Sequence, residues 1–134
     1  MGVVEIGDII YRDIKAHFPD IKVYRSSLMP FGEIKGEQIH IIVKQNVQGT
    51  YWRSSFVEVN FCVPYIKGEK ANLDKLSYFS KEGKKCFNFP SSVTGEHQGY
   101  SYSYKIESES QENDPDMRCY FINQKLRFNI LNIL

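Results

Sequence analysis

The chain has 134 residues, a length typical of one domain, and its 42% hydrophobic and 25% charged residues are ordinary for a globular protein. Its 17 basic and 16 acidic residues nearly cancel, so the composition lacks the basic excess typical of nucleic-acid binders. No stretch approaches the roughly 18 apolar residues of a membrane span, and three dispersed cysteines indicate no disulfide framework. We therefore expect a single cytoplasmic domain over residues 1–134 with no membrane or nucleic-acid partner.

The first fifty residues predict a helix followed by short strands. Residues 3–18 place apolar side chains at helical spacing, and Pro19 ends this amphipathic helix because proline cannot continue it. Gly7 weakens the first turns, so we expect the helix to begin late. A short strand over 20–25 follows.

Two stronger strands flank a turn in the next part of the chain. Residues 27–37 contain proline and two glycines and predict a loop, whereas the β-branched run at 38–45 predicts a strand. Gly49 marks a turn within 46–51. Residues 54–66 then alternate as a strand that Pro64 closes, and the apolar parity consists of Val57, Val59, Phe61 and Val63.

The period changes to that of a helix between residues 67 and 87. Leu73, Leu76 and Phe79 share one helical face, Asn72 is placed to cap its start, and Gly83 is placed to end it. Residues 88–99 are rich in serine and glycine and predict an irregular connector.

Two long alternating segments predict a hairpin at the carboxyl-terminal end. Residues 100–110 and 117–131 alternate apolar and polar side chains, and the segment between them carries Asn113-Asp114-Pro115-Asp116, a turn sequence. Gln124 interrupts the apolar parity of the second segment. The order is helix, strands, helix, hairpin, which predicts an α+β fold: an antiparallel sheet, mixed at its edge, with both helices on one face.

Tyrosines at period two occupy one parity of the first hairpin strand: Tyr100, Tyr102 and Tyr104, followed by Ile106. Two interpretations are open. Tyr buries its ring and leaves its hydroxyl for a partner, so the row fits the core face of a sheet. The same row is also a candidate wall of an apolar ligand pocket. A nucleic-acid platform is disfavoured, because residues 107–116 carry acids and no base.

Charge is distributed unevenly along the second half of the chain. Acids gather at the predicted hairpin tip, and lysines gather in and after the second helix. Solvated surface is one interpretation. The other is head-to-tail docking of the tip on the helix of a neighbouring copy, which forms rings when the rotation closes. The candidate subunit-interface residues are Glu107, Glu109, Glu112, Asp114, Asp116, Lys81, Lys84 and Lys85.

Motifs for catalysis, metals or cofactors are absent from the sequence. The three histidines are isolated, and no GxSxG, HExxH, GxGxxG or phosphate-binding loop occurs. Cys86 and His97 have the residue types of a nucleophile and its base, but nothing beyond residue type pairs them. We therefore expect no enzyme activity, no cofactor and no metal site.

The order of elements resembles that of the tail-terminator (tail completion) and neck proteins of long-tailed bacteriophages. The corresponding stretches are IGDIIYRDIKAHFPD, IKVYR, LMPFGEIKGE, QIHIIVKQ, FVEVNFCV, NLDKLSYFSKEGKKCF, YSYSYKIESES and DMRCYFINQKLRFNIL, which cover nearly the whole chain. The likeness lies in this order of elements, so it assigns no function to individual residues. It implies a non-enzymatic virion component that forms a ring on the tail tube and contacts tail-tube or neck proteins. The alternative is a monomeric ligand-binding domain whose pocket is lined by the three tyrosines.

Overall fold

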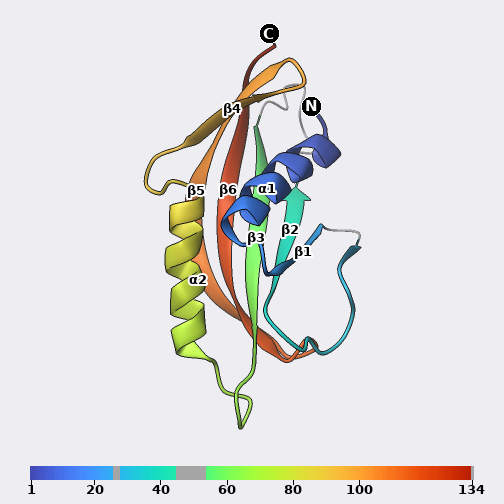
Figure 1. Cartoon of the computed structure of the whole chain (residues 1–134), viewed down its shortest axis with the longest axis vertical. Coiled ribbons are helices and arrows are strands. Elements are labelled where there is room, and N and C mark those ends of the chain that lie inside the picture. Colours follow the sequence, from blue (N-terminus) through green and yellow to red (C-terminus); the bar gives the residue numbers. More distant parts are fainter. Residues whose placement is uncertain (26–27, 45–53, 134) are drawn as a thin grey trace.

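Two helices and six strands build the fold, which a computed structural model describes over residues 1–25, 28–44 and 54–133 (Figure 1). The turn expected within 46–51 lies outside these residues. In chain order the elements are α1 (Val3–His17), β1 (Lys22–Arg25), β2 (Gln38–Lys44), β3 (Ser54–Pro64), α2 (Leu73–Cys86), β4 (Val93–His97), β5 (Tyr100–Asp114) and β6 (Cys119–Ile133).

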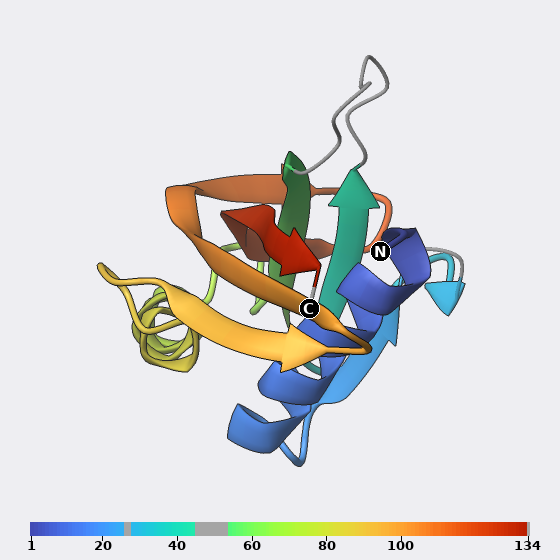
Figure 2. The same ribbon diagram turned by 90° about the horizontal axis from the view of Figure 1, so that it is seen from above.

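The strands form one sheet in the order β1-β2-β3-β6-β5-β4. The edge strand β1 runs parallel to β2, and every other pair is antiparallel. Figure 2 shows that the sheet curls, so that α1 lies within its concave side. The predicted class, α+β with a mixed edge and two helices on one face, is confirmed.

Helix α1 fills the concave side because its apolar stripe is continuous. Ile6, Ile9, Ile10 and Ile14 are buried in the main core. The helix already begins at Val3, so the expected late start is wrong. The Gly2 backbone N–H donates to the Glu5 carboxylate at 2.9 Å, which satisfies a backbone group that the first turn leaves free.

Helix α2 starts as the sequence predicts but ends later. The Asn72 side chain accepts from the Lys75 backbone N–H at 3.3 Å, which confirms the cap. Leu76 and Phe79 are buried, whereas Leu73 is exposed. Gly83 does not end the helix, which continues to Cys86. Gly83 instead allows the helix backbone to approach Gln124 of β6 closely.

Strand β3 confirms the alternation predicted for its core face. Val57, Val59, Phe61 and Val63 are buried in the same core cluster as the helix residues. Phe61 stacks on Phe79 of α2 with ring centroids 5.6 Å apart, so β3 and α2 pack ring against ring.

The expected irregular connector over 88–99 contains a strand. β4 pairs with β5 through a two-residue turn at Gln98 and Gly99, which have φ angles of 47° and 83°. Two consecutive left-handed residues form the kind of turn that suits a tight hairpin. The Thr-Gly-Glu segment of β4 lacks the β-branched alternation by which strands are predicted, so only the Gln-Gly pair signalled this hairpin.

The long hairpin extends further than predicted. β5 continues to Asp114, and the turn occupies residues 115–118. Asp114 Oδ1 accepts from the Met117 backbone N–H at 3.1 Å, which confirms the expected local bonding by a turn aspartate.

Candidate interaction surface at the hairpin turn

Three connecting segments meet where the hairpin turns, and we call this region the loop end. They are residues 28–37, 65–70 and 115–118. The Ile34 N–H donates to the Met117 carbonyl at 3.1 Å, and the Tyr65 N–H donates to the Arg118 carbonyl at 3.0 Å. Two backbone hydrogen bonds therefore join the hairpin turn to both other segments.

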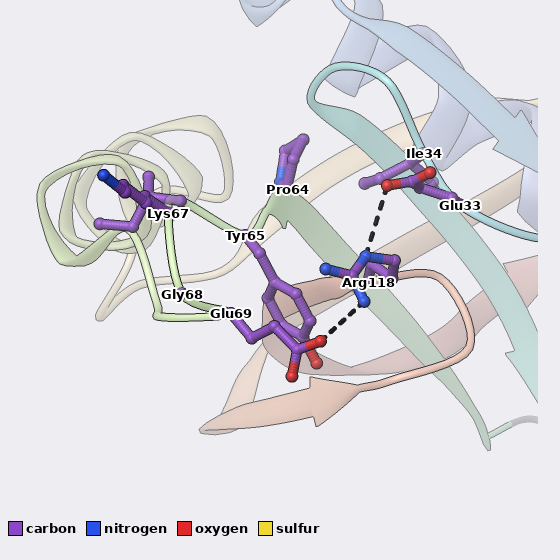
Figure 3. A pocket seen from close by; sticks show the side chains of 9 residues that line it. Glu33, Ile34, Pro64, Tyr65, Lys67, Gly68, Glu69 and Arg118 are labelled. Carbon is purple, nitrogen blue, oxygen red and sulfur yellow. Dashed lines mark hydrogen bonds and ion pairs between the residues drawn. The ribbon is translucent and has the colours of Figure 1, made fainter.

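Arg118 connects the same segments through its side chain (Figure 3). Its guanidinium donates to Glu69 at 2.8 Å, lies 3.4 Å from Glu33, and sits 5.4 Å from the ring centroid of Tyr65. These groups line a pocket of about 430 Å³. The carboxylates are about half exposed, so each ion pair stabilises little. Their effect is to hold three loops in one arrangement.

Phe31 projects from the first of these loops. Its side chain is 101% exposed, the highest value among the large hydrophobic residues described. Ile34, three residues later, is 4% exposed and packs against Cys62 and Cys119. The loop is thus anchored at Ile34 and presents an aromatic ring to solvent, where it is available to a partner.

The five acids predicted as an interface divide into two groups. Glu107 and Glu109 are bound within the chain: Glu107 accepts from Arg127 at 2.7 Å, and Glu109 accepts from Ser80 and Gln124, both at 2.9 Å. Asp114 caps the turn. Glu112 and Asp116 are exposed and form no ion pair within residues 1–25, 28–44 and 54–133.

The three lysines divide in the same way. Lys84 lies 3.6 Å from Glu109 and Lys85 lies 3.1 Å from Glu82. Lys81 is exposed and forms no ion pair in the described part of the chain. Two residues predicted to meet across a subunit boundary, Lys84 and Glu109, therefore contact each other within one copy.

The tyrosine row lies against α1. Tyr102 and Tyr104 are 2% and 1% exposed, and Tyr100 is half-buried. Arg12 donates to the Tyr102 hydroxyl at 2.9 Å, and the Tyr104 hydroxyl donates to Asp13 at 2.6 Å. Both buried rings are packed and both hydroxyls are bonded. This placement favours the core interpretation over a ligand-pocket wall.

The thiols occupy two separate places. Cys86 lies near α1, where its thiol approaches the Asp13 carbonyl at 3.6 Å. It shares a shallow pocket with His17 and not with His97, which pairs with Tyr100 in the β4–β5 hairpin. On the opposite face of the sheet, a hydrogen bond with Cys119 and burial both raise the pKa of Cys62.

Cys86 is expected to react slowly with alkylating agents. Burial raises the pKa of its thiol to about 12 from 9.0, and Asp13 adds to the rise, so the thiolate fraction at pH 8 falls about a thousandfold. Peptide mapping after iodoacetamide treatment measures the rate, with the urea-unfolded chain as reference. If Cys86 were labelled under native conditions as fast as in the unfolded chain, that result would contradict the burial of its thiol and would favour a nucleophilic role.

Within 1–25, 28–44 and 54–133, no group of three His, Cys, Asp or Glu side chains is arranged to hold a metal ion. Neither described helix is long and apolar enough to cross a membrane.

Sequence reasoning missed the residues that organise the loop end. Arg118, Glu33 and Glu69 are far apart in the sequence, and nothing local marks them as partners. Phe31 did carry a signal, because an aromatic residue between Pro30 and Gly32 in a loop has no regular element in which to be buried.

Comparisons with known proteins define the class of fold and nothing finer. No protein-family model matches the sequence, and no curated protein matches it. One solved structure, whose name describes no activity, matches over 93% of this chain and 95% of its own, with a TM-score of 0.54 and 11% sequence identity. At that identity the likeness concerns the fold alone.

Proposed function

We propose that this protein is a non-enzymatic structural component of a phage or prophage tail. Copies of the chain form a ring at the end of the tail tube, where the ring mediates tail completion and joining to the head. The protein is cytoplasmic in the host cell until it enters a virion. The order of elements predicted from the sequence supports this proposal, because it resembles that of tail-terminator and neck proteins over nearly the whole chain.

The observation that carries ring formation is a set of three complementary charges at two different places on the molecule. Glu112 lies near the end of β5 and Asp116 in the hairpin turn, whereas Lys81 lies on α2, and none of the three forms an ion pair among the described residues. Figure 1 shows α2 along one side of the sheet and the β5–β6 turn at its lower end. Opposite charges at two different places favour head-to-tail contact, which generates a ring when the rotation closes.

Charge reversal tests this contact. E112K combined with D116K reverses the sign of the charges near the hairpin turn, and K81E reverses the sign of the charge on α2. Each variant alone is expected to weaken self-association about tenfold or more, because like charges then face each other. An equimolar mixture of the two variants restores association, since each reversed surface meets a reversed partner. Sedimentation velocity measures all three samples.

Lys22 provides the matched control. It is exposed on β1 and forms no ion pair in the described part of the chain, so K22E makes the same charge change elsewhere. It is expected to leave association unchanged. If the mixture fails to associate, or if K22E weakens association as much as K81E, the assigned contact is wrong.

A further inference from the structure

The face of the sheet that carries no helix holds a pocket of about 470 Å³. Ile39 and Ile41 of β2 point into the main core, so His40 between them points to the opposite face. The loop bearing Phe31 covers this part of the face, and the hairpin turn closes one side. The wall is largely apolar and includes Met29, Phe31, Met117 and Phe121.

Asp114 is the only acidic or basic residue besides His40 among the residues that line this pocket. It is half-buried, and its Oδ1 accepts one hydrogen bond, from the Met117 backbone N–H. No cation pairs with it within residues 1–25, 28–44 and 54–133. A carboxylate beside apolar walls has lost part of its hydration, so an incoming positive charge is favoured there more than at the open surface.

His40 does not supply that positive charge. Its side chain is almost fully buried, Nε2 donates to Gln38 Oε1 at 2.9 Å, and Nδ1 faces the Cys62 sulfur at 4.0 Å. Burial lowers the pKa of the imidazole, against a smaller opposing effect of Asp114. The ring is therefore neutral at pH 7, and the pocket keeps the negative charge of Asp114.

We propose that this pocket binds a small organic cation, a protonated amine that carries an apolar group. The ammonium group pairs with Asp114, and the apolar group lies against the methionine side chains and the rings of Phe31 and Phe121. Aromatic faces attract cations, which adds to the preference for a charged ligand over a neutral one of the same shape. The pocket shares the hairpin turn with charges proposed to join copies of the chain, but none of those three charged residues lines it.

Two matched probes test the proposal: 2-phenylethylammonium and the neutral 2-phenylethanol. Titration calorimetry and saturation-transfer NMR are expected to show at least about fivefold tighter binding of the ammonium, consistent with one partly desolvated charge pair. D114N is expected to remove this preference while keeping the turn, because an amide oxygen also accepts from Met117. F31A is expected to weaken binding a few-fold without unfolding, since the Phe31 side chain is fully exposed in the free protein.

Glu96 supplies the control, because it is an exposed carboxylate on β4, does not line the pocket and has no part in the proposed contact between copies. E96Q is expected to leave the preference for the ammonium unchanged. Nα-acetyl-lysine amide carries the same ammonium on an aliphatic chain and represents a protein side chain; weaker binding than the phenyl probe is expected. Equal binding of amine and alcohol, equal losses in D114N and E96Q, or tighter binding of the lysine probe would each overturn the proposal.

Discussion

Replacing Phe128 with alanine is expected to lower the free energy of unfolding by about 3–5 kcal/mol, the usual cost of removing a buried aromatic ring. Phe128 is 1% exposed and packs against both buried tyrosines of β5. Its ring centroid is 5.2 Å from that of Tyr102 and 5.8 Å from that of Tyr104. The substitution therefore leaves a cavity beside both tyrosine rings.

Denaturant unfolding followed by circular dichroism measures this loss, at one protein concentration because self-association contributes to apparent stability. Leu131 of the same strand is 49% exposed, so L131A is expected to change stability by no more than about 0.5 kcal/mol. A cost below about 1 kcal/mol for F128A would show that the tyrosine row is not packed in the core.

The second large effect concerns two helical glycines that respond oppositely to the same substitution. G7A is expected to stabilise the protein by up to about 1 kcal/mol, because alanine favours a helix and its Cβ meets Val43 at 3.7 Å and Arg25 at 3.9 Å, both ordinary contact distances. G83A is expected to destabilise it by about 1–3 kcal/mol, because its Cβ falls 2.9 Å from the Gln124 amide carbon.

Gln124 cannot move aside easily. Its side chain is fully buried, and its Nε2 donates to the Ser80 carbonyl at 3.2 Å and to Glu109 at 2.9 Å. Removing most of that side chain with Q124A is expected to reduce the cost of G83A, which a double-mutant cycle measures. Equal effects of G7A and G83A would contradict the close approach of α2 to β6.

The sequence predicted those parts of the fold that depend on local periodicity. Spacings of 3.6 or 2 residues predicted the apolar stripe of α1, the alternation of β3 and the long hairpin. The folded structure keeps these spacings, because each follows from the geometry of a helix or a strand. β4 was missed because its pairing depends on β5 and on the turn at Gln98 and Gly99. The prediction that Gly83 ends α2 was wrong, because Gly83 allows a close approach to Gln124, which is distant in the sequence.

The candidate surface was predicted only in outline. The hairpin acids and helix lysines were identified by residue type, but sequence order does not show that Glu109 folds back onto Ser80 and Lys84. The loop end was not predicted, because Arg118 gathers its partners from three separate segments. Such long-range contacts leave no local pattern.

The molar mass of the wild-type protein in solution, measured by light scattering across salt and protein concentration, tests most directly whether the chain acts by self-assembly. At low salt we expect a molar mass that is a defined multiple of 15.6 kDa. We expect this oligomer to dissociate as salt rises, because screening weakens contacts between charged surfaces. A mass of 15.6 kDa at every salt and concentration tested would contradict the account.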